Sequence, residues 1–360
     1  MLDRYPPEDR PYYPFPGETL SHFCFPSGIV FATERGVPTH FSFMLTDAAG
    51  ARIYGTAVTF DETLSPELRT QIRSKGHVYA EQIYTQKAIC VLSHYSFIDS
   101  FKEVLKQLYR IHLSHTPIPI ERFVVNIMEE IPVPDKQGQV QILHEIGNQA
   151  IPFYRAVDQY PPYASRSEIE YLFRALNAEQ VIDIFMALLL EKKVLLISKY
   201  KALLTHASIA LISFLFPLCW KNTWIPILPR NMTDVLDAPF PFLIGVDPTI
   251  LKESEAFEIP NEVYRVDLDM GFISPRDAKP KLPSKEYKAL KQRLIKATEG
   301  VERPGLDMVE QAFNVVSWQE QADDEDEEAR RFNEYEVRDA FLEFMTSIMQ
   351  GYTKCLVSRD

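Results

Sequence analysis

Apolar and polar positions alternate in the first quarter of the chain as they do in β structure. Within residues 20–60, the runs FSFMLTD and RIYGTAVTF flank a short turn-like break at Ala48-Ala49-Gly50. This arrangement predicts a β-hairpin. After a polar excursion at residues 62–76, strand-like composition returns in HVYAEQIYTQKAICVLS. The segment as a whole therefore predicts an antiparallel meander.

A helical period follows the meander. Apolar residues recur from Phe97 to Tyr109 at three- and four-residue spacings, which predicts a helix with one face packed on the preceding sheet. Pro117 and Pro119 interrupt the pattern, and residues 120–130 are expected to form a second helix. The first lobe, residues 1–135, is thus expected to be an α+β arrangement.

Residues 136–165 have the composition of a connector. They contain several prolines, one strand-like piece, QVQILHEI, and the tail AVDQYPPYAS. We therefore place the boundary between two lobes in this segment.

The next part of the chain, residues 166–275, alternates between strand-like and helical patterns. We expect the strand EYLFRAL, a helix from Ala178 to Leu190, the strand KVLLIS, a helix from Leu203 to Phe216 and the strand WIPILP. Asn177 and Gln180 have the spacing of a capping box at the start of the first helix. Nearly continuous apolar strands indicate a parallel or mixed sheet covered on both faces, so this core is expected to be α/β. Residues 276–360 are expected to be mainly helical, with the acidic run 323–328 as a solvated loop.

Length and charge narrow the class of protein. A chain of 360 residues exceeds the usual size of one compact core, which agrees with two lobes. Its net charge of −12 gives no broad cationic field for nucleic acid or anionic lipid. The N-terminus has acids and prolines in place of the basic start and apolar block of a signal peptide. The apolar stretch 202–218 contains His206 and Pro217, which favours a buried helix over a membrane span.

Cysteine usage and the missing catalytic motifs argue against several kinds of site. The four cysteines are far apart and lack CxxC spacing, which favours free thiols in a cytoplasmic setting. No glycine-rich phosphate loop, GxSxG or HExxH motif occurs. His112 and His115 have helical spacing but lack companion ligands, so we expect no metal site. Lys192 and Lys193 are interpreted as a solvated helix end because no partner for catalysis is evident. No cofactor is expected.

The motifs together resemble the tripartite DENN module over nearly the whole chain. FCFPSG at residues 23–28, FSFMLTD and Tyr54-Gly55 are similar to the upstream segment, and KAICVLSHYSF is similar to the start of the central segment. LFRALNAEQVIDIFMALLLEKKVLLIS, TWIPILP and LDAPFPFLIG continue it in the family's order, and VRDAFLEFMTSIMQGY resembles the downstream segment. The chain departs from the family pattern at Ser96, where proline is frequent, and at its acidic insert.

The resemblance implies an α/β protein overall, with an N-terminal longin-like α+β lobe and a C-terminal α/β sandwich lobe with added C-terminal helices. It implies guanine-nucleotide exchange on a Rab-type small GTPase, whose switch regions would bind between the lobes, and recruitment of a cytoplasmic protein to membranes. The alternatives are a GTPase-binding or scaffold module without exchange activity and an arginine-finger GTPase-activating subunit. For the last, Arg69 and Arg73 in the polar excursion are the candidates, although loop arginines are usually only solvated.

Two groups of polar residues are the candidate GTPase contacts. The first group flanks the start of the helix that follows the meander, where capping is the alternative role for Ser96. The second group follows a predicted strand end, where ligand-facing loops occur in open α/β sheets and where turn formation is the alternative role. The candidates are His94, Ser96 and Asp99 in the first group and Asn231, Asp234 and Asp237 in the second.

Overall fold

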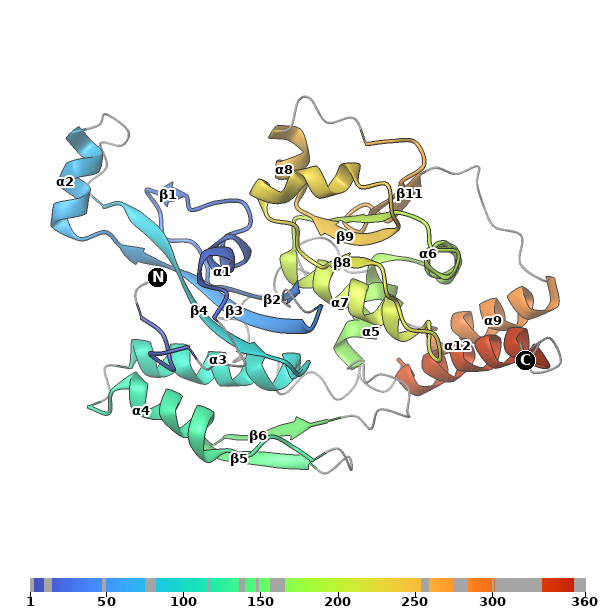
Figure 1. Cartoon of the computed structure of the whole chain (residues 1–360), viewed down its shortest axis with the longest axis horizontal. Helices are drawn as coiled ribbons and strands as arrows, with labels where there is room; N and C mark the ends of the chain where they lie inside the picture. The colour runs from blue at the N-terminus through green and yellow to red at the C-terminus, as the bar shows by residue number, and fades with distance from the viewer. Residues whose placement is uncertain are drawn as a thin grey trace, which may run out of the picture. The chain divides into compact units, whose positions relative to one another are not determined.

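The computed structural model describes the chain in segments that form two compact units (Figure 1). The described residues are 3–9, 15–46, 50–74, 82–114, 117–135, 140–146, 149–155, 166–253, 259–274, 284–299, 301 and 332–352. Unit 1 contains Met1–Asp158, Ile227–Val235 and Val309–Gln319, and unit 2 contains Gln159–Pro226, Leu236–Met308 and Glu320–Asp360. Unit 1 is therefore not a continuous stretch of sequence.

Unit 1 is built on a four-stranded antiparallel sheet with the order β1-β4-β3-β2. Its strands are β1 Phe31–Ala32, β2 Thr39–Thr46, β3 Arg52–Thr63 and β4 Tyr84–Ser93. The predicted hairpin is confirmed by the pairing of β2 with β3, and the meander by the pairing of β3 with β4. The polar excursion contains the helix α2, Pro66–Ser74.

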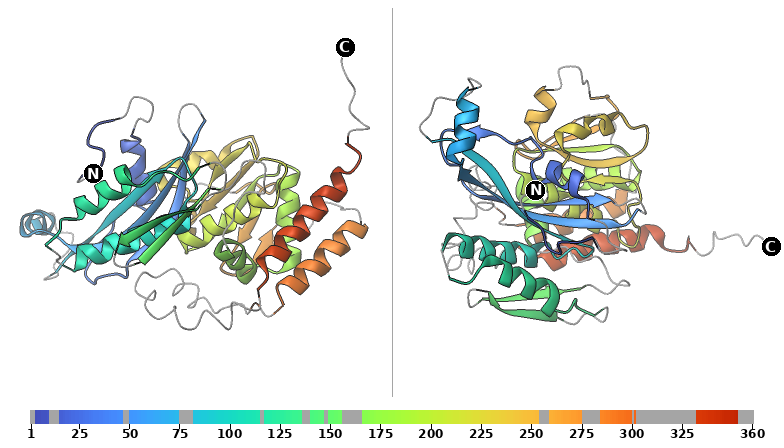
Figure 2. Two further views of the ribbon diagram at one scale, coloured as in Figure 1. Left: turned by 90° about the horizontal axis from the view of Figure 1, so that it is seen from below. Right: turned by 60° about the vertical axis from the view of Figure 1, so that its left-hand side comes forward.

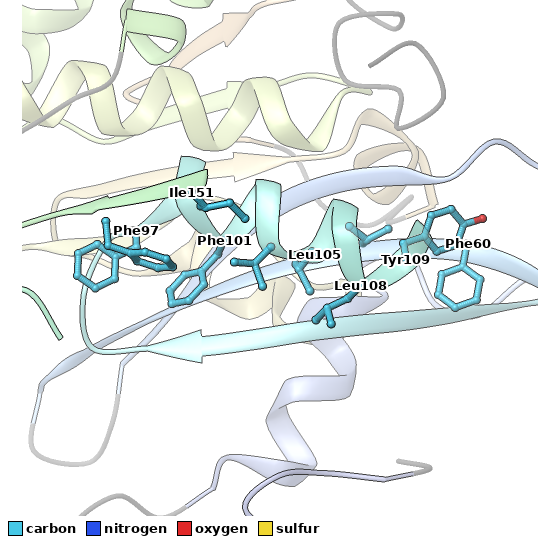
Figure 3. Close-up of a cluster of buried hydrophobic side chains, with 10 residues drawn as sticks. Phe60, Phe97, Phe101, Leu105, Leu108, Tyr109 and Ile151 are labelled. Atoms are coloured by element: carbon cyan, nitrogen blue, oxygen red, sulfur yellow. The ribbon is translucent and has the colours of Figure 1, made fainter. Parts of the chain in front are cut away.

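Helices cover both faces of this sheet (Figure 2). The helix α1, Gly17–Cys24, packs on one face, where the rings of Phe23 and Phe43 lie 5.5 Å apart. The helix α3, Ile98–Leu113, packs on the other through Phe101, Val104 and Leu105, as the periodicity predicts. Figure 3 shows this cluster, in which the α3 side chains meet Phe60 of β3. Burial of these rings and branched side chains is the main stabilisation of unit 1.

Further elements pack against α3 in addition to the sheet. The predicted second helix is present as α4, Ile120–Val125, which continues into a π-helical turn, Asn126–Glu130. The strand-like piece in the predicted connector forms β5, Val140–Ile146, which pairs with β6, Gln149–Tyr154. Ile151 and Phe153 of β6 belong to the same buried cluster as α3. This hairpin therefore forms part of unit 1's core.

The cysteines of unit 1 are free thiols. Cys24 of α1 lies against Cys90 of β4, and a hydrogen bond with Cys24 together with burial raises the pKa of the Cys90 thiol. Cys219 in unit 2 is also free and is exposed, whereas Cys355 lies outside the described residues. The expectation of unpaired cysteines is confirmed for these three.

Unit 2 contains a five-stranded sheet with the order β11-β10-β7-β9-β8. Its strands are β7 Val194–Ile197, β8 Thr223–Ile225, β9 Phe242–Val246, β10 Tyr264–Asp267 and β11 Phe272–Ser274. All neighbouring pairs are parallel except β10 with β11. The prediction of a parallel or mixed sheet is confirmed. WIPILP forms a shorter strand than expected because Pro226 lacks the amide hydrogen that a ladder needs.

Six α-helices accompany this sheet in the described part of unit 2. They are α5 Arg166–Ala175, α6 Ala178–Leu189, α7 Lys201–Ser213, α8 Pro248–Glu253, α9 Ser284–Ala297 and α12 Glu334–Met349. The capping box of α6 is present, with hydrogen bonds of 2.9 Å in both directions between Asn177 and Gln180. Both figures show α9 and α12 side by side, and Arg293 of α9 bonds to Glu336 of α12 at 2.7 Å. The helical character expected for the C-terminal part is thus observed in its described residues.

One predicted strand is wrong. EYLFRAL forms the second half of the helix α5 up to Ala175, and no part of it lies in a strand. The buried residues there are Ile169, Leu172, Phe173 and Leu176, whose spacing is that of one helix face. A short apolar run cannot by itself distinguish a buried strand from a buried helix. The longer segment that begins at Ile169 shows helical spacing and therefore favours the helix.

The apolar stretch considered as a membrane span forms the buried helix α7. Its His206 and Ser208 are buried along with the apolar residues. Within the residues that the structure describes, no helix combines the length and the hydropathy needed to cross a bilayer.

The sequence LEKKVLLIS forms the end of α6 and the whole of β7. The amide of Lys192 donates to the Ala187 carbonyl (2.8 Å), and that of Glu191 donates to the Leu188 carbonyl (2.9 Å), which is the hydrogen-bond pattern of a Schellman motif. Glu191 occupies the left-handed position with a φ of 51°. Lys193 Nζ lies 2.5 Å from Glu262 and lowers the pKa of that carboxyl group. Both lysines thus belong to a helix end and its surface, as interpreted from the sequence.

We expect Glu191→Gly to stabilise the protein by about 0.5–1 kcal/mol, because glycine adopts the left-handed conformation without the steric cost that a Cβ imposes. Denaturant unfolding measures the difference. Glu191→Ala is the matched control, since it also removes the contact between Glu191 and Asn222 but keeps the Cβ. Equal stability of the glycine and alanine variants would contradict the prediction.

Candidate functional site

The first group of candidate residues lies in the corner that joins β4 to α3. His94, Ser96 and Asp99 are all exposed there, while Phe97 and Ile98 between them are buried. The corner is shaped by two local hydrogen bonds, from the Tyr95 amide to Ser93 Oγ and from the Phe97 amide to the Tyr95 carbonyl, each 3.0 Å long. His94 and Ser96 are thereby presented on one short loop of a rigid scaffold, and Asp99 follows them in the first turn of α3.

The alternative role of Ser96 as the cap of α3 is wrong. The N-cap residue is Phe97, and no side chain caps this helix. Phe97 is held in that position by its ring, which packs edge-on against Phe153 at 5.4 Å. Hydrophobic packing therefore fixes the start of α3, and the exposed hydroxyl of Ser96 is available to a partner.

An arginine that the sequence interpretation missed completes this corner. The guanidinium of Arg155, just after β6, lies 4.5 Å from the centre of the Tyr95 ring, a cation–π contact. Among the described residues, no carboxylate forms an ion pair with Arg155. Ser100 Oγ donates to the Pro152 carbonyl at 2.5 Å and ties β6 to α3 near this point. The corner therefore carries a positioned cation as well as the predicted polar side chains.

The second group of candidates lies on the 3-10 segment η2, Arg230–Asp237, which follows β8 and precedes β9. Asn231, Asp234 and Asp237 are exposed, and Leu236 is buried. The amide of Arg230 donates to the carbonyl of Pro26, 2.8 Å away, in the segment that follows α1. Asn231 and Asp234 accordingly belong to unit 1, together with the corner residues, whereas Asp237 belongs to unit 2.

The arginine-finger candidates lie on α2. Nη2 of Arg69 donates to the Leu64 carbonyl, 3.1 Å away, so this guanidinium is engaged beside the start of its own helix. Arg73 is in the same helix, and its side chain lies outside the described residues. The geometry of Arg69 suits helix stabilisation.

A polar network that the sequence interpretation also missed lies at the carboxyl ends of the parallel strands of unit 2. Ser198 Oγ donates to Asp269 Oδ1 at 2.6 Å, and the Lys199 amide donates to Asp269 Oδ2 at 2.9 Å. Burial lowers the pKa of Lys201 there, and the charge of Asp247 opposes the shift. Loops at such strand ends often carry ligands, but Ser198 and Asp269 bond to one another and fix the loops between strands.

A separate cavity of about 450 Å³ lies where α5, α6 and α9 meet. It is lined by Phe173, Leu176, Asn177, Ala178, Gln292, Ile295, Lys296, Thr298, Glu299 and Val301. None of the predicted contact residues lines it. Within the described ranges, no three His, Cys, Asp or Glu side chains converge as metal ligands, and His115 lies outside those ranges.

Comparison with known proteins finds two family models along the chain. The DENN (AEX-3) domain model matches residues 84–271, and the uDENN domain model matches residues 1–60. The chain is also similar to the DENN domain and WD repeat-containing protein SCD1 of Arabidopsis thaliana, with 24% identity over 305 residues. The match covers 82% of this chain and 25% of that relative, so the chain spans about a quarter of the relative's length.

Proposed function

Because the chain belongs to the DENN (AEX-3) domain family, we propose that it is a guanine-nucleotide exchange factor for a Rab-type small GTPase in membrane traffic. The family match carries this proposal, since the central model covers more than half of the chain and the upstream model precedes it in the expected order. The exposed polar corner between β4 and α3 supports it by offering a protein-binding surface.

Exchange of this kind requires no covalent step. The exchange factor binds the nucleotide-free GTPase more tightly than the GDP-bound form, and thermodynamic linkage then requires it to weaken GDP binding. A thousandfold loss of nucleotide affinity corresponds to about 4 kcal/mol of differential binding, which a few well-placed contacts can supply. We assign such contacts to the corner residues His94, Ser96 and Asp99, and to Asn231, Asp234 and Asp237 on η2.

Release of fluorescent GDP from a panel of purified Rab proteins tests the proposal. We expect catalytic amounts of the chain to accelerate release from at least one Rab, with an active exchange factor as the positive control. Binding that does not depend on the nucleotide and leaves release unchanged would instead identify a binding module. An increase in GTP hydrolysis that Arg69→Ala removes would identify a GTPase-activating subunit. Either result would overturn the proposal.

Asp237→Ala is expected to lower kcat/KM for exchange about tenfold, equivalent to about 1.4 kcal/mol, without changing thermal stability. The side chain is exposed, so its removal leaves the core intact. Asp339→Ala, at an exposed position on α12, is the matched control and should leave exchange unchanged. A loss of thermal stability in Asp237→Ala would show that this residue forms the turn and does not contact the GTPase.

A further inference from the structure

The outer edge of β4 is largely unpaired in the part of unit 1 that the structure describes. β4 has ten residues, but β1 pairs with only two of them, Tyr84 and Thr85. Along the remaining residues, Gln86–Ser93, no described residue pairs with β4 on that side, whereas the other side pairs with β3 throughout. This free edge is about 27 Å long at the usual rise of roughly 3.4 Å per residue.

Helices cover both faces of the sheet, but no described strand covers this edge beyond β1. Figure 2 shows α1 and α3 on opposite faces of the sheet. All ten residues of β4 are nevertheless only half-buried, while six consecutive residues of β3 are buried. An uncovered row of backbone N–H and C=O groups pairs readily with an added strand. The edge is therefore a surface for β-strand addition.

The two ends of the free edge differ in chemistry. At the Ser93 end, the chain enters the corner where the guanidinium of Arg155 lies on the Tyr95 ring and, among the described residues, lacks a carboxylate partner. At the other end, the residues that lead into β1 are apolar and exposed, with exposed fractions of 55% for Ile29, 58% for Val30 and 47% for Phe31. Between the ends, Ala88–Ser93 contains no charged side chain.

We propose that the outer edge of β4 binds an extended polypeptide segment that runs antiparallel to β4, in line with β1. In this orientation the N-terminal end of the added segment lies at the Ser93 end, where an acidic side chain would pair with Arg155. Its centre is uncharged and β-branched, and its C-terminal end carries an apolar side chain that packs on Ile29, Val30 and Phe31. This surface goes beyond the proposed exchange activity and requires no GTPase.

A polypeptide of this chemistry fits the edge better than a second copy of the chain. Antiparallel pairing of two β4 edges would bring Arg155 of one copy to the end of the strand that carries Lys87 in the other, where the Glu62 carboxylate already pairs with Lys87. The net charge of −12 on each copy also opposes self-association.

The test uses the full chain and a defined peptide, acetyl-Asp-Thr-Val-Thr-Val-Thr-Phe-amide. We expect saturable binding by calorimetry, and we expect slower amide hydrogen exchange in β4, at Gln86–Ser93, when the peptide is bound. Two isomers of the peptide, N-methylated on alternate amides, are matched controls because only one set of amides faces β4. One isomer should bind at least tenfold more weakly than the other.

Exchanging the charges of Arg155 and of the first peptide residue tests the antiparallel orientation proposed for the bound peptide. Arg155→Glu should weaken peptide binding about tenfold, and a peptide that begins with lysine should recover the loss. Arg122→Glu, at an exposed position on α4, is the control and should have no effect.

Several results would overturn the proposal. They are the absence of binding at about 1 mM peptide, equal binding of the two methylated isomers, and protection outside β4. A dimer in sedimentation whose β4 amides are already protected would show that a second copy occupies the edge. GDP release is measured in a separate assay, so the proposed exchange activity and the proposed peptide binding at β4 can each fail without the other.

Discussion

Gly245→Ala is expected to lower the free energy of unfolding of unit 2 by about 3 kcal/mol or more. Gly245 lies in β9, between β7 and β8 in the sheet. A Cβ at this position would lie 1.9 Å from the carbonyl oxygen of Pro226 and 3.1 Å from Cβ of Leu204. Because the nearest atom belongs to the backbone of the chain that leaves β8, the clash can be relieved only by moving the sheet.

Thermal unfolding measures this effect, with an expected decrease in Tm of roughly 6–12 °C for a unit of this size. Gly351→Ala is the control in the same unit. Its φ of 83° imposes backbone strain of about 1 kcal/mol, but a Cβ there would have no atom within 4 Å. If the two variants lose similar stability, the close approach at Gly245 does not constrain the sheet.

Phe341→Ala is expected to cost about 3–5 kcal/mol, as is usual for the removal of a buried ring. Phe341 on α12 is 1% exposed. Its ring stacks on Phe214 at 4.0 Å and meets Phe185 of α6 edge-on at 4.9 Å. The aromatic contacts connect the last described helix to the residues that follow α7 and to α6, so the substitution would leave a cavity at the centre of unit 2.

Denaturant unfolding with tryptophan fluorescence measures this loss. Tyr335→Ala removes an aromatic side chain from the same helix at a position that is 70% exposed, and it should cost less than about 0.5 kcal/mol. A Phe341→Ala protein as stable as the Tyr335→Ala protein would show that α12 is not part of the core. The downstream segment would then be an appendage of unit 2.

Short sequence patterns correctly predicted those elements that are formed by residues close together in the sequence. The hairpin from β2 to β3, the apolar face of α3 and the capping box at Asn177 each depend on residues close in sequence. The helix α5 was missed because EYLFRAL was interpreted as a short apolar run, although Ile169 just before it has helical spacing with the buried residues Phe173 and Leu176. The left-handed conformation of Glu191 has no sequence signal, since glycine is the usual residue at that position.

For the candidate contact residues, the property that the sequence predicted is exposure. The exposed positions of His94, Ser96 and Asp99 agree with residues that can contact a partner, and the position of Asp237 does so too. Arg155 was missed because its contact with Tyr95 joins residues sixty positions apart, and no short pattern encodes such a contact. Asn231 and Asp234 likewise belong to unit 1 because of tertiary packing. The periodicity of a sequence does not predict such packing.

The discontinuity of unit 1 has a consequence for synthesis on the ribosome. Its main part ends at Asp158, but Ile227–Val235 belongs to the same unit. At about 5–20 residues per second, the roughly 70 residues between these segments take about 3–14 s to translate. During that time the nascent N-terminal unit therefore lacks a segment, Ile227–Val235, that packs with it in the folded protein. A chaperone that protects the newly made sheet would act during this interval, and a nascent chain released before residue 235 would carry an incomplete unit.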